Sequence, residues 1–258
     1  MTLQLFFDVL CTNLHLIILF FAVAILYSSV GFGGGSSYLA ILALTGIVFT
    51  QIRTTALLCN IVVVTGNVYL FHQQKKIDWR KVFALTLFSV PLAYLGGCLK
   101  IGQQFFFVLL AVTLLFAAIT MWVSKKIISS DENKINSKLI KNMSYGGIIG
   151  FVSGMVGIGG GIFLAPFLHL TNWDTPKKIA ATASVFILAN SISGFWGQYS
   201  NPDFMIDWNL TSVLLVTVFI GGQIGIRISN NIFSPIQLKK ATAILIAFVS
   251  IRILFKYL

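Results

Sequence analysis

The sequence predicts an all-α polytopic membrane protein made of two inverted-topology repeats. Of its 258 residues, 57% are hydrophobic and only 10% are charged, and the mean hydropathy is +0.91. Soluble domains carry about 25% charged residues, so this composition excludes a water-soluble globule. It also excludes a disordered chain, which requires low hydrophobicity. Long apolar segments between short polar connections then indicate several membrane spans of ~20 residues each.

The apolar segments fall into two sets on either side of one polar stretch. Their approximate ranges are 14–30, 36–50, 54–71, 82–99 and 104–123, then 143–156, 162–171, 178–198, 210–226 and 238–256. The polar stretch 124–142 carries charged, Ser and Asn residues that cannot lie in lipid. We therefore predict one membrane domain over residues 1–258. It consists of repeat 1 (14–123), a cytoplasmic linker (124–142) and repeat 2 (143–258).

Four short signals recur in the same order in both sets, at offsets of 126, 127, 129 and 129 residues. The matching pairs are Gly31-Phe32-Gly33-Gly34-Gly35 with Gly157-Ile158-Gly159-Gly160-Gly161, Ile52-Arg53-Thr54-Thr55-Ala56 with Ile179-Ala180-Ala181-Thr182-Ala183, Asp78-Trp79 with Asp207-Trp208, and Gly96 with Gly225. A nearly constant offset over four signals predicts an internal duplication.

Helix length predicts how the two copies are oriented. One unbroken helix over residues 14–50 would be about 55 Å long, whereas the hydrocarbon core is ~30 Å thick. The glycine run must therefore break the helix and reverse the chain. Each half then contains a glycine-tipped hairpin, either fully spanning or re-entrant, and three spanning helices. This odd number of segments inverts the second half relative to the first.

The positive charges agree with this topology. The loops 72–81, 124–143, 171–178 and 227–240 share one side of the predicted membrane and contain 14 of the 18 Lys and Arg residues. By the positive-inside rule this side is cytoplasmic, so both termini are expected outside a bacterial inner membrane. Because the basic residues cluster between apolar segments, we do not expect nucleic acid as a partner.

These motifs together resemble the TauE/SafE sulfite exporter family, bacterial membrane permeases built from duplicated halves. The resemblance rests on the glycine run, the Thr-containing helix start, the repeated Asp-Trp pair and the later glycine, and it covers roughly residues 14–256. It implies export of a small anion such as sulfite, a sulfonate or a related organic acid. The motifs specify the family well and the substrate poorly.

All seven Asp and Glu residues lie outside the predicted spans. Intramembrane carboxylates commonly relay protons or coordinate cations, so their absence disfavours a carboxylate-driven antiporter or a cation channel. A site without fixed negative charge suits an anion. The alternative is that the chain simply avoids charge in lipid.

The two glycine runs are the predicted binding elements. Glycine adopts positive φ, and a helix that starts after the run directs its positive end toward a ligand. The alternative role is close helix packing. Because desolvating an anion costs several kcal/mol, hydroxyl and amide donors are needed as well, and Ser28 and Ser29 are further candidates. The predicted substrate-binding residues are Gly33, Gly34, Gly35, Ser36, Ser37, Thr54, Thr55, Asn60, Gly159, Gly160, Gly161, Thr182, Ser184 and Asn190.

Arg53 begins a predicted span at the position where repeat 2 has Ala180. It is our candidate gate residue, attracting anions at the outer mouth, or else a cation that reaches the lipid headgroups. Asp78-Trp79 and Asp207-Trp208 each precede a span. Asp is a good helix N-cap and Trp favours the membrane interface, so we expect a structural role for both pairs.

The predicted function is secondary transport of a small anion by alternating access around the glycine breaks. An anion channel through the same breaks is the alternative, followed by a non-transporting membrane sensor or scaffold. No nucleophile–base pair or metal cluster falls at membrane depth, so we expect no enzymatic activity, cofactor or metal. The expected partners are the anionic substrate and the lipid bilayer, with homo-oligomerisation left open.

Overall fold

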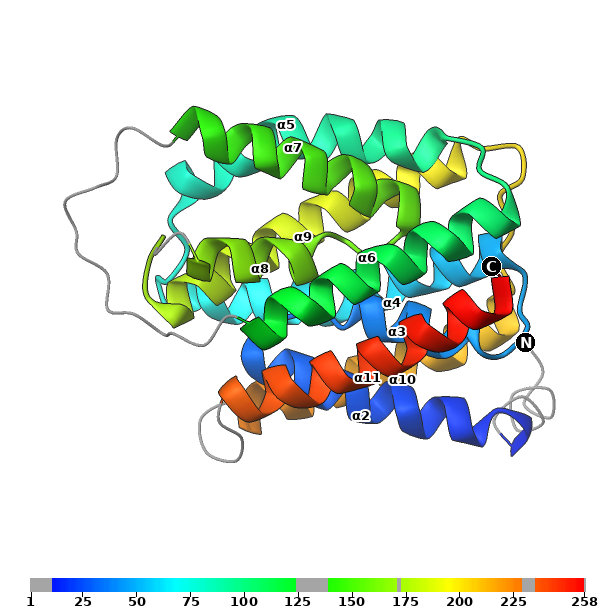
Figure 1. The fold of residues 1–258 in the computed structure, drawn as a ribbon. Coiled ribbons are helices and arrows are strands. Elements are labelled where there is room, and N and C mark those ends of the chain that lie inside the picture. The colour runs from blue at the N-terminus through cyan, green and yellow to red at the C-terminus, as the bar shows by residue number, and fades with distance from the viewer. Residues whose placement is uncertain (1–10, 124–138, 171–172, 229–234, 258) are drawn as a thin grey trace.

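A computed structural model describes residues 11–123, 139–170, 173–228 and 235–257, and every regular element in these ranges is a helix (Figure 1). The predicted all-α class is confirmed. The first half contains α2 (Leu14–Val30), α3 (Gly35–Ala43), α4 (Phe49–Gln73), α5 (Trp79–Cys98) and α6 (Gln103–Val123). The second contains α7 (Leu139–Val156), α8 (Gly161–Leu170), α9 (Pro176–Tyr199), α10 (Trp208–Ile228) and α11 (Pro235–Tyr257).

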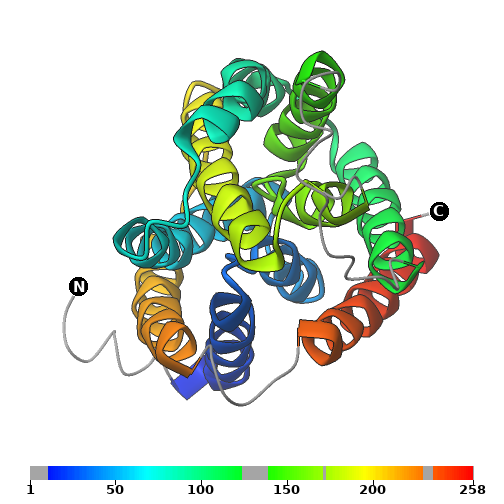
Figure 2. The same cartoon turned by 90° about the vertical axis from the view of Figure 1, so that its left-hand side faces the viewer.

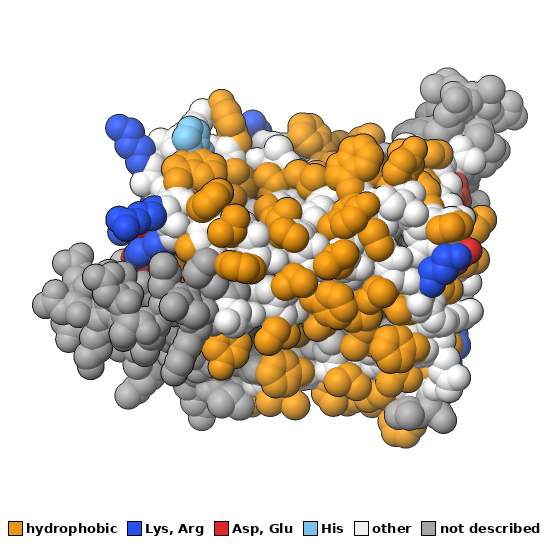
Figure 3. Space-filling view, turned by 90° about the horizontal axis from the view of Figure 1, so that it is seen from above, with side chains coloured by type: hydrophobic (Ala, Val, Ile, Leu, Met, Phe, Trp, Pro, Cys, Tyr) orange, Lys and Arg blue, Asp and Glu red, His pale blue; other side chains and the backbone are white. Residues whose placement is uncertain are grey.

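Four helices are long and apolar enough to cross a membrane: α4, α5, α10 and residues Lys177–Tyr199 of α9. Large apolar side chains such as Phe83, Phe116 and Phe248 lie exposed on the outside of the molecule. Figure 3 shows hydrophobic side chains covering the face between two ends that carry the charged groups. Exposed apolar area of this extent marks a contact surface, here the surface that faces lipid.

The glycine-tipped hairpins have arms of unequal length. The first arms, α2 and α7, have 17 and 18 residues and are about 26 Å long. The second arms, α3 and α8, have 9 and 10 residues and are about 14 Å long, too short to cross a ~30 Å core. Every residue of α3 is buried, so this short arm lies inside the helix bundle.

Two predicted boundaries need correction. The apolar segment 36–50 is not one helix, because α3 ends at Ala43 and Phe49 already belongs to α4. Between them Gly46 adopts a positive φ of 77°, a left-handed turn that interrupts the helix. In addition, α7 starts at Leu139, within the predicted linker 124–142, whose residues 124–138 lie outside the described ranges.

Helices of the first half pack mainly on helices of the second. α5 packs along α7, α10 along α2, α11 along α6 and α4 along α9. The repeated glycines explain the first two contacts. A Cβ on Gly96 would lie 2.2 Å from the carbonyl oxygen of Phe151 in α7, and one on Gly225 would lie 2.4 Å from that of Ile25 in α2. Glycine at these positions allows the helix backbones to approach closely.

The long helices run in two opposite directions. In Figure 1, α2, α4, α6 and α10 run from right to left, and α5, α7, α9 and α11 run from left to right. The start of α2 and the end of α11 therefore lie at the same end of the molecule. In the end-on view of Figure 2, α3, α8 and the start of α9 lie inside the ring that the other helices form. The short arms form the interior together with α4 and α9, which are the most buried of the four long apolar helices.

The described acidic residues lie at the ends of the molecule, outside the membrane-spanning segments. Asp78 caps α5 by accepting from the backbone N–H of Lys81, and Asp207 accepts from the N–H groups of Asn209 and Leu210 at the start of α10. Asp174 and Asp203 lie in interhelical connections. The predicted N-cap role of Asp78 and Asp207 is confirmed. The other three acids, Asp8, Asp131 and Glu132, lie outside the described ranges.

Candidate functional site

The two glycine runs break their helices in the same way. Gly31 ends α2 with φ of 89°, and Gly157 follows the end of α7 with φ of 88°. Gly34 and Gly160 precede α3 and α8 with φ of 86° and 82°. These left-handed conformations are strained for residues with a side chain. The chain reversal that the glycine runs predict is therefore built on paired left-handed glycines in both halves.

Asn60 joins the two breaks. It lies near the middle of α4 and is 1% exposed. Its Oδ1 accepts a hydrogen bond from the backbone N–H of Gly35 at 3.2 Å, and its Nδ2 donates to the carbonyl oxygen of Ile158 at 3.3 Å. Nδ2 also donates to the Ser191 hydroxyl of α9 at 2.9 Å. One buried amide of α4 thus binds both breaks and α9.

The glycines around Asn60 provide the space for it. A Cβ on Gly33 would lie 1.8 Å from Asn60 Oδ1, and one on Gly159 would lie 2.4 Å from Asn60 Nδ2. A Cβ on Gly35 would lie 2.8 Å from the carbonyl oxygen of Ile158, so the two breaks touch directly. The N–H of Gly35, a predicted substrate-binding residue, is used by Asn60 in this conformation.

The first break is also held by the long central helices. Asn67 of α4 donates to the carbonyl oxygen of Phe32 at 3.1 Å and accepts from Ser28 at 2.8 Å. The Ser184 hydroxyl of α9 bonds to the carbonyl oxygen of Gly31 and to that of Ala180. Ser184, predicted as a substrate residue of the second half, therefore contacts the break of the first half.

The other predicted residues divide by position. Ser36 and Ser37 lie buried in the first turn of α3, where Ser37 pairs with the Tyr27 hydroxyl at 2.8 Å. Asn190 donates to Phe186 of its own helix, and Thr182 is buried on α9. Thr54 and Thr55 lie closer to the start of α4, bonded to Gln198 and Thr211. The side-chain bonds of these two threonines go to α9 and α10 rather than to the breaks.

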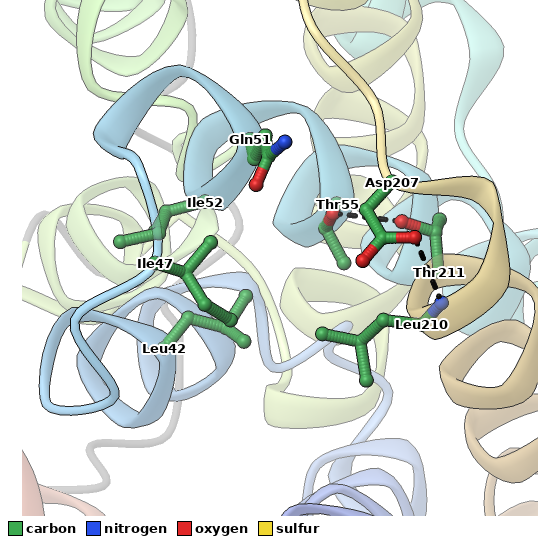
Figure 4. Close-up of a pocket in the computed structure, with 8 residues that line it drawn as sticks. All are labelled: Leu42, Ile47, Gln51, Ile52, Thr55, Asp207, Leu210 and Thr211. Carbon is green, nitrogen blue, oxygen red and sulfur yellow. Dashed lines mark hydrogen bonds between the residues drawn. The ribbon is translucent and has the colours of Figure 1, made fainter. Parts of the chain in front are cut away.

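A small cleft opens beside Thr55 at the end of the molecule where α4 begins (Figure 4). Its volume of about 30 Å³ suits water rather than a larger ion. Thr55 and Thr211 line one side, with the Asp207 carboxylate beside them (Figure 4). A carboxylate repels anions, so this cleft does not fit the predicted substrate.

Arg53 does not reach the lipid, since it is 3% exposed and lies against the second break. A Cβ on Gly157 would lie 3.3 Å from the Arg53 carbonyl oxygen. Its counterpart Ala180 packs in the same way on the first break, 3.3 Å from a Cβ on Gly31. Arg53 and Ala180 thus make equivalent contacts with the break of the opposite half, but only Arg53 is a cation.

Comparison with known proteins agrees with this architecture. The model of a family described as sulfite exporter TauE/SafE matches residues 16–253. The chain belongs to the TauE/SafE family. It is 32% identical over 246 residues to a probable membrane transporter protein of Sinorhizobium fredii, covering 93% of this chain and 97% of the relative. It is 25% identical over 261 residues to a probable membrane transporter protein of Methanocaldococcus jannaschii, covering 93% and 94%. No solved structure matches the chain.

Sequence reasoning missed Asn67 and Ser191, which help to hold the breaks of this TauE/SafE protein, and Gln198, which accepts a hydrogen bond from Thr54. Asn67 and Gln198 are buried amides within apolar helices, which is itself a signal, because polar groups at membrane depth require a partner. Ser191 directly follows Asn190, which was predicted instead. The orientation of α9 decides which of these two neighbours faces Asn60.

Proposed function

We propose that this membrane transporter is a secondary carrier that exports a small anion by alternating access around the paired glycine breaks. The observation that carries the proposal is the meeting of both breaks at Asn60, near the middle of α4. Paired interrupted helices at mid-membrane depth are the characteristic binding element of repeat-built transporters. We place the protein in a bacterial inner membrane with both termini outside.

The proposed inverted repeat has support from helix direction and from packing. Each pair of corresponding helices, such as α4 with α9 or α5 with α10, runs in opposite directions in Figure 1. The cross-half contacts also occur in matched pairs, α5 with α7 and α10 with α2. Two halves related in this way can exchange their conformations, which opens the site to one side and then to the other.

The charge of the interior supports an anionic substrate. The described carboxylates lie at the ends of the molecule, whereas Arg53 is buried beside a break. Sulfite, a sulfonate or a related organic acid fits these conditions. The substrate would be bound by the glycine runs and by the neighbouring hydroxyl and amide groups predicted above. In the absence of an intramembrane acid, proton coupling would depend on the substrate's own protonation or on a histidine.

In the described conformation Asn60 already binds the N–H of Gly35 in one break and the carbonyl oxygen of Ile158 in the other. Transport therefore requires these hydrogen bonds to exchange for bonds to substrate as one half rocks against the other. Each hydrogen bond contributes about 1 kcal/mol net. Such an exchange is small enough for a bound anion to drive.

Counterflow in proteoliposomes tests this proposal. Vesicles are preloaded with unlabelled sulfite and radiolabelled sulfite is added outside, with sulfate, thiosulfate, methanesulfonate, acetate and chloride as competitors. A carrier gives transient accumulation of label, and the order of competition identifies the anion class. Non-saturating flux without counterflow would instead indicate the alternative anion channel. Folded protein that moves no anion would favour a sensor or scaffold.

A further inference from the structure

Arg53 is a buried cation whose hydrogen-bonding groups are not satisfied. Among the described residues, neither its Nε nor its Nη2 has a hydrogen-bond partner, although both atoms are buried. The guanidinium carbon lies 5.9 Å from the centre of the Phe106 ring, so an aromatic ring packs near the guanidinium group. Nε and Nη2 form one edge of the guanidinium group, which presents two roughly parallel N–H donors.

Thr50 adds a second unsatisfied group on the same face of α4. Its hydroxyl is buried without a hydrogen-bond partner in the described part of the chain. Thr50 and Arg53 are three residues apart on the helix, so their side chains are neighbours. Both lie in the first two turns of α4, whose N-cap residue, Val48, provides no side-chain cap. The positive end of the helix dipole therefore adds to the charge of Arg53.

No carboxylate in the described ranges balances this charge. The ion pairs found there involve Lys81, Lys100 and Lys178, but not Arg53. An unpaired buried cation is expensive, and its cost falls when an anion with good hydrogen-bond geometry accompanies it. A guanidinium edge suits two oxygens on one central atom, as in a sulfonate, sulfite or carboxylate, better than it suits a spherical halide.

We infer that Arg53 and Thr50 form an oxyanion subsite beside the second glycine break, with the guanidinium edge binding two oxygens of the anion. This inference rests on the proposed function, and it assigns the charged side chain that would contact the transported anion. Ala180 occupies the equivalent position against the first break. The subsite is therefore present once, at the end where α4 begins, and the two faces of the carrier differ in their attraction for the anion.

The test compares Arg53→Lys and Arg53→Gln with Arg252→Lys and Arg252→Gln. Arg252 is exposed and lies near the end of α11, at the same end of the molecule, so it controls for the change in charge. Two measurements are made on purified full-length protein. One is the half-saturating sulfite concentration in counterflow, and the other is the rise in melting temperature on adding sulfite, methanesulfonate or chloride.

We expect sulfite and methanesulfonate, but not chloride, to raise the melting temperature of the wild type and of both Arg252 variants. Arg53→Gln should lose this rise, while Arg53→Lys should need about tenfold more sulfite because it keeps the charge but loses the bidentate edge. If Arg53→Gln does not fold, Arg53→Lys decides the question. Wild-type responses in the Arg53 variants would overturn the subsite and leave the transport proposal intact. An Arg53-dependent rise in melting temperature without counterflow would support the subsite and overturn the transport proposal.

Discussion

Asn60 of α4 donates a 2.9 Å hydrogen bond to Ser191 of α9, and so links the central helices of the two halves. The same amide also contacts Gly35 in one glycine break and Ile158 in the other. Any motion of one half against the other must strain or replace these bonds. The Asn60 amide can therefore couple substrate binding at the breaks to the motion of one half against the other.

Asn60→Asp should abolish anion transport. A carboxylate cannot donate to Ile158 or Ser191, and it puts a negative charge between the two breaks. We expect a loss of roughly 1–3 kcal/mol in stability from the unsatisfied groups, together with loss of sulfite counterflow. Asn209→Asp, the same change at an exposed site at the start of α10, is the control and should transport normally. Normal transport by Asn60→Asp would exclude the breaks as the substrate site.

Gly33→Ala should impair transport by displacing Asn60. The added methyl group would lie 1.8 Å from Asn60 Oδ1, so the amide must give up its position between the breaks. Gly102→Ala is the matched control, because a Cβ there meets nothing within 4 Å. We expect counterflow rates to fall at least about tenfold in the first variant, in line with the cost of overpacking a filled site. Equal rates in the two variants would contradict the packing described here.

Asp174→Asn should destabilise the protein near neutral pH but not in acid. Burial raises the pKa of Asp174, but the hydrogen bonds from Lys81 and Thr175 and the charges of Lys81 and Lys178 lower it below its ordinary value of 3.8. A carboxyl whose pKa is lower in the folded than in the unfolded protein stabilises the fold at pH values above its unfolded-state pKa. This stabilisation is lost as the pH falls through the folded-state pKa.

The measurement is the melting temperature of each variant against pH. The wild type should exceed Asp174→Asn at pH 7, and the difference should close as the pH falls below about 4. Asp203→Asn is the control, because the Lys100–Asp203 pair is largely exposed and 3.9 Å apart, and such pairs contribute little. A difference in melting temperature that stays unchanged at acidic pH would indicate a cause other than the charge of the Asp174 carboxylate.

Cysteine labelling tests the proposed orientation. Cys11 is exposed just before α2, whereas Cys59 is buried. In a Cys98→Ser background, a membrane-impermeant maleimide should label Cys11 in intact spheroplasts. Gln74→Cys, placed in the exposed α4–α5 connection of a protein that also lacks Cys11, should be labelled only after permeabilisation. The reverse pattern would place the termini in the cytoplasm.

The sequence alone determined the helices, the positions of the breaks and the family. A long apolar segment in lipid has few alternatives to a helix, because every backbone N–H and C=O group must be hydrogen-bonded within the protein. The glycine runs were readable because left-handed backbone strongly favours glycine. The motifs that recur at nearly constant offset were visible without coordinates. The largest shifts of predicted boundaries are at the Gly46 turn, where α3 ends and α4 begins, and at the start of α7.

The tertiary structure decided which polar groups meet. Asn60 was predicted as a donor to substrate. Only the packing of α4 against helices of the second half brings its side chain to both breaks. Which of Asn190 and Ser191 faces the centre depends on the rotation of α9. The polar residues of α9 are spread around the helix, so its sequence carries no signal for that rotation. The burial of Arg53 against Gly157 likewise follows from contacts between residues about a hundred positions apart. Sequence periodicity reports local geometry, whereas a binding site depends on how distant segments pack.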